Sequence, residues 1–256
     1  MRRLLTTERH RRILERVASE GVIDFASLAD ALEVSSMTIR RDVRILEERG
    51  HIQMTRGGAS AMLTSTNDIL THPRAYDQAS EKTQIGQYAA TLIERGEVLF
   101  LGSGSTTAVF AQFLPADLDL TVITSSLPHA SLLGSRGINV ISTGGTILKD
   151  DLTQTGQIAH NTLAGFLATR AIIGAGGVSA KDGITEFDLA IAVLNRVMIE
   201  NAEEVICLVD SSKAGVAGNF RTVKVAQVDE YITSVAGGPI FAKELGSGAQ
   251  ILTPNS

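Results

Sequence analysis

The chain has 256 residues, enough for one large domain or for a small domain joined to a medium-sized one. Apolar residues make up 44% and charged residues 20%, the balance of a soluble globular protein with a sizeable core. No apolar run is long enough to cross a bilayer, and no apolar stretch follows the basic start "MRRLLTTERHRR", so neither a membrane span nor a secretory signal is expected. The single cysteine, Cys207, excludes an internal disulfide and fits a cytoplasmic protein.

The charge is divided unevenly along the chain. The net charge is −5, but residues 1–58 hold 11 arginines, no lysine and nine acidic residues, which gives them +2 and leaves −7 for the rest. A mildly basic head on an acidic body indicates two domains with different tasks. For nucleic-acid binding the local charge matters more than the overall value.

Three helical patterns follow one another in the head. In the first two, apolar residues recur at helical spacing: Ile13, Leu14, Val17 and Ala18, then Phe25, Leu28, Ala29 and Leu32. A short turn leads to the third pattern, in which Ile39, Val43 and Leu46 form a buried stripe. Ser35 or Ser36 is a good N-cap for this helix, because a serine hydroxyl can accept an unpaired backbone N–H.

The face of the third helix opposite this stripe is basic. Met37, Arg40, Arg41 and Arg44 project away from the stripe, and Thr38 lies on its flank. Arginine can contact guanine with two hydrogen bonds or neutralise phosphate, so such a helix is suited to the DNA major groove. The order helix, turn, helix therefore favours a helix-turn-helix whose third helix reads DNA.

Two further observations bear on this prediction. Asp42, Glu47 and Glu48 could pair with the arginines, which would make the face a plain solvated surface. After the helix, residues 51–55 alternate like a strand and "RGG" is typical of a tight turn, so a wing is expected with Arg56 near the DNA backbone or minor groove. The candidate DNA-binding residues are Ser35, Ser36, Met37, Thr38, Arg40, Arg41, Arg44 and Arg56.

The stretch "VSSMTIRRDVRILEERGHIQMTRGGA" resembles the signature of the DeoR family of bacterial transcription repressors. Members of that family have a winged helix-turn-helix whose reading helix carries a Thr-Ile-Arg-Arg-Asp core, here Thr38 to Asp42, and a wing that ends in His-Gly-Gly-Ala. Arg56 stands where the family usually has His, and it keeps a basic donor. The resemblance implies double-stranded operator DNA as the partner.

The rest of the chain predicts a linker and an α/β domain. Residues 59–81 lack a sustained period and contain Pro73 among polar residues, so we expect a linker between a head at 1–58 and a body at 82–256. From Lys82 onward helical and strand patterns alternate, which predicts an α/β domain with a mostly parallel sheet. In such sheets ligands bind beyond the carboxyl ends of the strands.

Loops rich in glycine and hydroxyl groups follow four of the expected strands. Exposed backbone N–H groups, hydroxyls and a helix N-terminus all favour an anion. One such loop alone is more often a plain tight turn, but four at equivalent strand ends, one with a lysine, predict a pocket for a small phosphorylated, hydroxyl-rich ligand. The candidate residues in these loops are Gly102, Ser103, Gly104, Ser105, Thr106, Thr107, Thr124, Ser125, Ser126, Gly144, Gly145, Asp210 and Lys213.

The body resembles the sensor domain of the DeoR family, which looks like ribose-5-phosphate isomerase and usually responds to a sugar phosphate. The segments "LGSGSTTAVF", "TSSLPHASLL", "STGG", "GAGGVSAKDGIT" and "VDSSKAG" carry this resemblance. It implies a phosphorylated sugar as effector, and Gly177 and Glu186 complete the candidate effector-binding residues. Gly102 stands where the family commonly has Asp and is closer to the Gly-Thr-Gly-Ser-Thr loop of the isomerase.

The alternative function is a sugar-phosphate isomerase related to ribose-5-phosphate isomerase. That reaction needs a general base, and the isomerase family keeps an Asp-Gly-Ala-Asp segment where this chain has "IIGAGGV". Ile173 and Gly176 stand at the two aspartate positions, and neither side chain can transfer a proton. Glu186 and Asp210 alone are poor support for catalysis, so we expect binding without turnover and no catalytic residue.

The expected function is a repressor of a carbohydrate-metabolism operon that a phosphorylated sugar releases from its operator. The five histidines show no metal-ligand spacing, and neither a metal nor a cofactor is expected. A single reading helix buries too little surface for tight specific binding, and operators are commonly paired half-sites. We therefore expect a homo-oligomer, a dimer or a tetramer, assembled through the acidic body.

Overall fold

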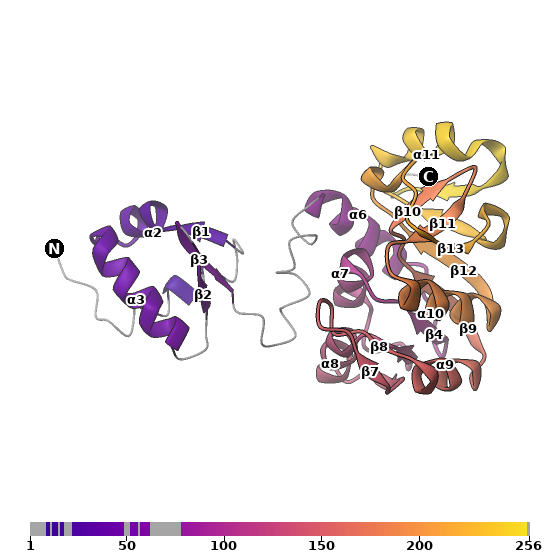
Figure 1. Ribbon diagram of the computed structural model, residues 1–256, viewed down its shortest axis with the longest axis horizontal. Helices are drawn as coiled ribbons and strands as arrows, with labels where there is room; N and C mark the ends of the chain where they lie inside the picture. The colour runs from indigo at the N-terminus through magenta and orange to yellow at the C-terminus, as the bar shows by residue number, and fades with distance from the viewer. Residues whose placement is uncertain are drawn as a thin grey trace. The chain divides into compact units, whose positions relative to one another are not determined.

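The chain folds as two compact units, Met1–Pro73 and Arg74–Ser256, each of which is visible in Figure 1. The computed structural model describes residues 9–10, 12–14, 16–17, 22–48, 52–55, 57–61 and 78–254. Within these ranges no helix is both long enough and apolar enough to span a membrane.

The smaller unit contains the three successive helices that the sequence predicts. Residues 9–17 are helical wherever they are described, α2 spans Phe25–Ala31, and α3 spans Ser36–Glu48. The apolar faces of the three helices meet in one core, which confirms the helical spacing. Its helical members include Ile13, Val17, Phe25, Leu28, Ala29, Leu32, Ile39, Val43 and Leu46.

A small antiparallel sheet completes this unit. It consists of β1 (Val22–Asp24), β2 (Ile52–Met54) and β3 (Gly58–Ala61), in the order β1-β3-β2. The hairpin of β2 and β3 agrees with the predicted wing, whereas β1 is not among the elements predicted from the sequence. A Cβ atom on Gly58 would lie 2.0 Å from the carbonyl oxygen of Ile23, so glycine is what allows β3 to approach β1.

Both domain boundaries expected from the sequence fall inside secondary structure. The sequence places the end of the head at residue 58, whereas β3 starts there and pairs with β1 and β2. The sequence places the start of the body at residue 82, whereas α6 spans Ala79–Ala90. Strand pairing at the first boundary and continuous helix at the second explain both differences.

The larger unit is built on a seven-stranded sheet whose neighbouring strands all run parallel, as the alternating pattern predicts. In sheet order the strands are β15 (Gln250–Leu252), β14 (Glu230–Ile232), β12 (Ala202–Leu208), β9 (Ala168–Ile173), β4 (Val98–Leu101), β5 (Thr121–Thr124) and β6 (Asn139–Ser142). Because the strands are parallel, their carboxyl ends lie at one edge of the sheet, called here the carboxyl edge.

Helices cover both faces of the sheet (Figure 1). On one face lie α6, α7 and α8, and on the other lie α9, α10 and α11. Side chains of β4 alternate accordingly, with Leu99 and Leu101 in the first layer and Phe100 in the second. The helices not yet delimited are α7 (Ser105–Phe113), α8 (Leu127–Ser135), α9 (Gln157–Ala164), α10 (Leu189–Glu200) and α11 (Gly237–Leu245).

Shorter strands and 3-10 helices complete the larger unit. A second antiparallel sheet has the order β10-β11-β13, and β7 and β8 form a two-stranded pair. These elements are β7 (Thr146–Ile147), β8 (Gln154–Thr155), β10 (Gly177–Ser179), β11 (Gly183–Glu186), β13 (Phe220–Val223) and the 3-10 helices η1 (Ser211–Lys213), η2 (Val225–Gln227) and η3 (Gly246–Gly248).

The order of the strands reverses between β4 and β9. From β4 the chain continues to β5 and β6 on one side, and from β9 it continues to β12, β14 and β15 on the other. The loops that follow β4 and β9 therefore lead away from each other at the carboxyl edge. In doubly wound sheets, ligands bind at this kind of switch point.

Candidate DNA-reading helix and effector site

The reading helix α3 begins at a capped serine. The hydroxyl of Ser35 accepts a hydrogen bond from the backbone N–H of Thr38 at 3.2 Å, and the two hydroxyl oxygens lie 2.9 Å apart. Ser36 is the first helical residue, so Ser35 is the N-cap of the two candidates. The hydroxyl of Thr38 is therefore hydrogen-bonded to the hydroxyl of the N-cap.

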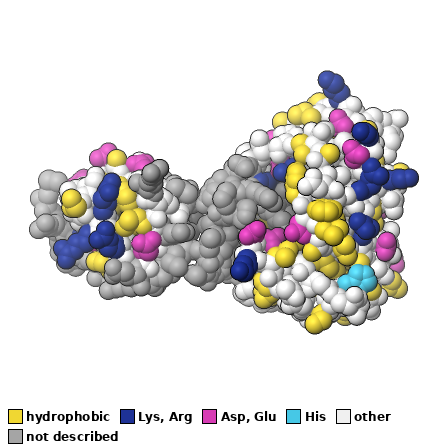
Figure 2. Space-filling view, viewed as in Figure 1, with side chains coloured by type: hydrophobic (Ala, Val, Ile, Leu, Met, Phe, Trp, Pro, Cys, Tyr) yellow, Lys and Arg dark blue, Asp and Glu magenta, His cyan; other side chains and the backbone are white. Residues whose placement is uncertain are grey.

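The outer face of α3 is basic and open to solvent. Arg40, Arg41 and Arg44 are exposed and Met37 is 77% exposed, whereas the apolar stripe of the same helix is buried. Figure 2 shows basic side chains gathered on one face of this unit. The guanidinium carbon of Arg40 lies 4.9 Å from the centre of the Phe25 ring, a cation–π contact that holds Arg40 beside the start of α2.

The acidic residues of α3 have partners other than the outward arginines. Asp42 is buried and accepts a hydrogen bond from Nη2 of Arg9 at 3.0 Å, and Nε2 of His10 lies 3.1 Å from its Oδ1. Glu47 accepts the backbone N–H of Met54 on β2 at 2.7 Å. The alternative in which Asp42 and Glu47 pair with the arginines is therefore wrong. The side chain of the third acidic residue, at position 48, lies outside the described residues.

Asp42 fastens the reading helix to the first helix. Burial raises the pKa of Asp42, but the hydrogen bonds from Arg9 and His10 outweigh this effect. The pKa of Asp42 therefore lies below its ordinary value, and the carboxylate stays charged. The wing is closed by a hydrogen bond from the N–H of Thr55 to the carbonyl of Gly58 at 3.0 Å. Arg56, expected at the tip of the wing, lies outside the described residues.

At the carboxyl edge, the loop after β4 opens directly into α7. Gly104 has a φ of 134°, which favours glycine, and no described side chain caps the helix. The first N–H groups of α7, on Ser105, Thr106 and Thr107, have no acceptor within the helix because nothing precedes them. Ser103 and Ser105 are half-buried and Gly104 is exposed, so this end is accessible. Free N–H groups and the positive end of the helix dipole together suit a phosphate.

Three of the candidate effector hydroxyls are used within the protein. The hydroxyl of Thr107 donates to the carbonyl of Gly104 at 2.9 Å, and the hydroxyl of Thr124 donates to the carbonyl of Leu101 at 2.7 Å. Ser126 caps α8 by accepting the N–H of the helix's first turn at 3.3 Å. All three residues are buried, so they shape the loops at the carboxyl edge.

The loop after β6 is held by Gln154. Its side-chain oxygen accepts hydrogen bonds from the hydroxyl of Ser142 at 2.5 Å and from the backbone N–H of Gly144 at 3.2 Å. The backbone N–H of Gln154 donates to the carbonyl of Ser125 at 2.7 Å. Strand β6 is the last of the sheet, two strands from β4. Gly144 and Gly145 therefore lie toward the edge strand, away from the switch point, whereas Ser125 follows β5, the neighbour of β4.

Glu186 and its neighbours stand at the switch point. A Cβ atom on Gly102 would lie 3.3 Å from Oδ1 of Asn195, and Nδ2 of Asn195 donates to Glu186 at 3.3 Å. The place where the family commonly has an Asp side chain therefore faces this Asn195–Glu186 pair. A Cβ atom on Gly177 would lie 2.3 Å from the carbonyl oxygen of Val216, so Gly177 serves backbone packing.

The two positions that hold aspartates in the isomerase lie close by. Ile173 is the last residue of β9 and is fully buried in the core. A Cβ atom on Gly176 would lie 3.0 Å from Oε2 of Glu186. Glu186 is thus the one carboxylate among these three positions.

The loop after β12 forms a buried ion pair with α6, whose lysine is not among the residues predicted from the sequence. Asp210 is 1% exposed, and its Oδ2 lies 4.0 Å from Nζ of Lys82, which is 2% exposed. Asp210 also caps η1, which contains the half-buried Lys213. A Cβ atom on Gly86, one turn after Lys82, would lie 2.8 Å from the backbone of α7, so α6 and α7 pack closely. Lys82 therefore adds a second cationic group at the carboxyl edge.

His129 lies fully buried beneath the glycine loop. Neither ring nitrogen makes a well-aligned hydrogen bond to another described group, although the backbone carbonyls of Gly102 and Gly104 are near. Burial lowers the pKa of His129 to about 4, and those two carbonyls partly oppose the shift. The imidazole is therefore neutral at pH 7.

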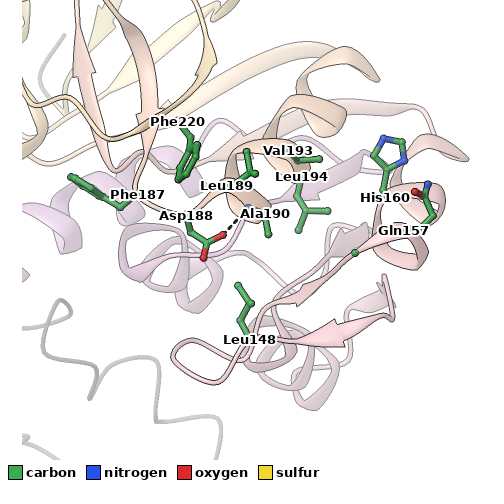
Figure 3. A pocket seen from close by; sticks show the side chains of 11 residues that line it. Leu148, Gln157, His160, Phe187, Asp188, Leu189, Ala190, Val193, Leu194 and Phe220 are labelled. Carbon is green, nitrogen blue, oxygen red and sulfur yellow. Dashed lines mark hydrogen bonds between the residues drawn. The ribbon is translucent and has the colours of Figure 1, made fainter.

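A cavity of about 650 Å³ lies beside α9 and α10, apart from the glycine loop (Figure 3). Its wall is mostly apolar and contains Leu148, Phe187, Leu189, Val193 and Phe220. None of its 11 lining residues is Lys or Arg, so it lacks a cation that a phosphate would need. The glycine loop, which offers the N–H groups at the start of α7, and the loop after β12, which contains Lys213, are the better candidates for an effector site.

Comparison with known families agrees with both halves of this description. Residues 9–65 match the DeoR-like helix-turn-helix domain, and residues 77–235 match the DeoR C terminal sensor domain. The chain belongs to the DeoR family. Its smaller unit is the helix-turn-helix domain of a DeoR-family regulator, and its larger unit is the sensor domain.

Several transcriptional regulators match nearly the whole chain. The HTH-type transcriptional repressor GlcR of Bacillus subtilis is 32% identical over 94% of this chain and 93% of its own length. The glycerol-3-phosphate regulon repressor of Escherichia coli is 30% identical over 89% and 90%, respectively. A ribose 5-phosphate isomerase A structure from Methanocaldococcus jannaschii covers 52% of each chain at 22% identity, with a TM-score of 0.40. A match that distant carries no conclusion about activity.

Proposed function

We propose that this DeoR-family regulator represses a carbohydrate-metabolism operon and leaves its operator when a phosphorylated sugar binds the sensor domain. The observation that carries the proposal is the pairing of an exposed basic reading helix with an uncapped helix N-terminus in a separate sensor domain. The name of one relative, a glycerol-3-phosphate regulon repressor, supports a small phosphorylated, hydroxyl-bearing compound as the effector.

On the DNA side, the reading face is formed by Met37, Arg40, Arg41 and Arg44, with the cap at Ser35. Arginine side chains reach guanine edges or phosphates from this position. Since Asp42 is committed to Arg9 and His10, the positive charge of the face is not cancelled by that carboxylate. Ser36, Thr38 and Arg56 complete the proposed set.

On the effector side, the phosphate is assigned to the N-terminal N–H groups of α7 and the loop Gly102–Gly104. Lys82 and Lys213 add positive charge from the neighbouring loop and helix, and Asp210 and Glu186 offer carboxylates that accept bonds from sugar hydroxyls. The buried candidates Thr106, Thr107, Thr124 and Ser126 are proposed to shape this site. Gly144, Gly145, Gly177 and Ser125 are proposed as structural supports.

We assign no enzymatic activity to the sensor domain. Proton transfer between sugar carbons needs a base with partners, and Glu186 stands beside Gly176 and the buried Ile173 instead of two aspartates. Ribose 5-phosphate incubated with the purified protein should remain unconverted. Turnover that disappears in Asp210→Ala would instead favour an isomerase.

A homo-oligomer is proposed because one reading helix is too small for a whole operator. The apolar surface around α9 and α10 supports assembly through the sensor domain, since large apolar side chains are exposed there: Ile147, Leu152, Ile158, Leu167, Phe187 and Leu189. Sedimentation should show a dimer or larger for the wild type and a shift toward monomer for Ile158→Asp. A monomeric wild type would contradict this part of the proposal.

The test of the function is selection of genomic DNA fragments by the purified full chain, repeated with a panel of sugar phosphates. The proposal predicts a few enriched fragments and the loss of enrichment with one member of the panel. The genes beside those fragments would name the operon. No enrichment at moderate salt, with or without sugar phosphates, would reject DNA regulation.

A further inference from the structure

The first turn of α6 is fastened to two loops at the carboxyl edge by one carboxylate. Glu81 accepts the N–H of Ser211 at 2.9 Å, the hydroxyl of Ser211 at 2.6 Å and the hydroxyl of Ser234 at 2.7 Å. Ser211 follows β12 and Ser234 follows β14, so the bonds join elements far apart in sequence. Three hydrogen bonds to a charged acceptor form a strong local fastening.

The same loop belongs to the proposed effector site. Ser211 directly follows Asp210, which pairs with Lys82 and caps the short helix that contains Lys213. A ligand that moves Asp210 or Lys213 therefore acts on the backbone N–H that Glu81 holds. Burial raises the pKa of Glu81, but hydrogen bonds from the serines and the charge of Lys82 lower it more, so the carboxylate is ionised at pH 7.

The start of α6 is also where the chain arrives from the DNA-binding unit. The smaller unit extends to Pro73, and α6 begins at Ala79. Gln78, the residue before the helix, has φ 56° and ψ 34°, a left-handed conformation that is strained for a residue other than glycine. A fastened helix turn behind a strained residue is a place where a small change at the ligand site can alter the path of the chain.

We propose that Glu81 is the positioning residue through which the effector site controls DNA binding. This inference rests on the proposed function. In this proposal the bonds from Ser211 and Ser234 to Glu81 hold the first turn of α6 in the arrangement that binds the operator as long as no effector contacts the loop 210–213. Effector contact with the loop 210–213 breaks those bonds and frees the first turn.

The opposite end of α6 offers a matched control. Glu97 is a buried carboxylate, whereas Glu81 is half-buried; Glu97 accepts a hydrogen bond from the N–H of Glu94 at 3.1 Å and pairs with Arg170 at 2.9 Å. It holds the segment that leads from α6 into β4, away from the carboxyl edge. A substitution there weakens the same domain without touching the fastening by Glu81.

The experiment compares effector-free full chains: wild type, Glu81→Gln, Glu81→Ala and Glu97→Gln. Operator affinity is measured by fluorescence anisotropy on a fragment selected by the wild type, and hydrogen exchange is followed at amides 79–84. Both Glu81 variants should exchange faster there and lose about tenfold or more in operator affinity, within the usual range of coupling between sites. Glu97→Gln should keep wild-type affinity, and the amides of α3 should exchange as in the wild type in all four.

Three results would overturn the inference: wild-type operator affinity in Glu81→Ala despite faster exchange at 79–84, unchanged exchange there in both Glu81 variants, or an equal loss in Glu97→Gln. Should Glu81→Ala fail to fold, Glu81→Gln keeps the side-chain size and carries the test. A wild type that selects no DNA would reject the proposed function itself, which is a distinguishable outcome.

Discussion

Asp42 stands on the same helix as three outward arginines, yet its carboxylate turns into the unit against Arg9 and His10. Removing the charge of one member of a buried ion pair leaves its partner uncompensated, which lowers the free energy of unfolding by about 3 kcal/mol. Asp42→Asn should therefore lower the free energy of unfolding of the DNA-binding unit by that order. Hydrogen exchange at the amides of α3 measures the loss, with Asp30→Asn on the exposed face of α2 as the control.

The same pair predicts acid sensitivity. The pKa of Asp42 is lower in the folded unit than in the unfolded chain, so its contribution to stability is present above the unfolded value and is lost as the pH falls through the folded value. The loss should therefore appear below about pH 4 in the wild type and be smaller in Asp42→Asn. An equally steep loss in both proteins would contradict the role given to Asp42.

Arg41 is an exposed member of the reading face, and its contribution can be separated from general charge. Arg41→Ala should weaken operator binding by about 1–3 kcal/mol if it contacts a base, whereas a phosphate contact would also lower the salt dependence of binding. Arg95→Ala, an exposed arginine of the sensor domain, makes the same change in net charge and should leave operator affinity as it is. Equal effects of the two substitutions in a binding titration would remove Arg41 from the reading face.

His129 makes the sensor domain sensitive to mild acid. Its pKa is about 4 in the folded domain and about 6.5 in an unfolded chain, so the unfolded state binds the proton first as the pH falls. The free energy of unfolding should therefore be constant above pH 6.5 as far as His129 is concerned, and it should fall by up to about 3 kcal/mol as the pH drops toward 4. Urea unfolding at several pH values should show this slope in the wild type and a flatter one in His129→Gln. The same slope in both would contradict the burial of a neutral imidazole.

At the scale of single elements, the cap of α3 provides a matched pair of serines. Ser35→Ala removes the acceptor of the Thr38 N–H and should cost about 1 kcal/mol of stability. Ser36→Ala, one position later, removes a hydroxyl that is already inside the helix and should cost little. Thermal unfolding of the two variants compares them directly, and a larger loss in Ser36→Ala would place the cap one residue later.

Long elements with a clear period are predictable from this sequence. The stripe of Ile39, Val43 and Leu46 fixes one face of α3, and that stripe is buried as expected. Strand β1 is missed because three residues between two helices give no recognisable alternation, and its partner β3 lies far along the chain. Its only local signal is the pair of β-branched residues Val22 and Ile23.

The candidate effector site is predictable in its loops but not in all its side chains. The parallel sheet does place the loops after β4 and β12 at one edge, as expected. Sequence alone cannot distinguish a hydroxyl that faces a ligand from one such as Thr124, which bonds to a neighbouring strand. It also cannot find Glu81 or Lys82, because their partners Ser211 and Asp210 are set by tertiary packing alone.

At the scale of the whole molecule, regulation requires coupling between the DNA-binding unit and the sensor domain. An effector can release the operator only if it binds the DNA-competent and DNA-incompetent states with different affinity. Typical coupling of about 1–3 kcal/mol changes operator affinity by roughly 5- to 150-fold, which is enough to switch a gene near its threshold. By reciprocity, operator DNA must weaken effector binding by the same factor.

The most direct test is an anisotropy titration of a selected operator fragment with the sugar phosphate that releases it, in the wild type and in Lys213→Ala. The wild type should lose at least about fivefold in operator affinity at saturating sugar phosphate. Lys213→Ala should bind the operator normally but need much more sugar phosphate for release. Release at the same concentration in both proteins, or loss of operator binding in folded Lys213→Ala before any ligand is added, would contradict a sensor site at the carboxyl edge.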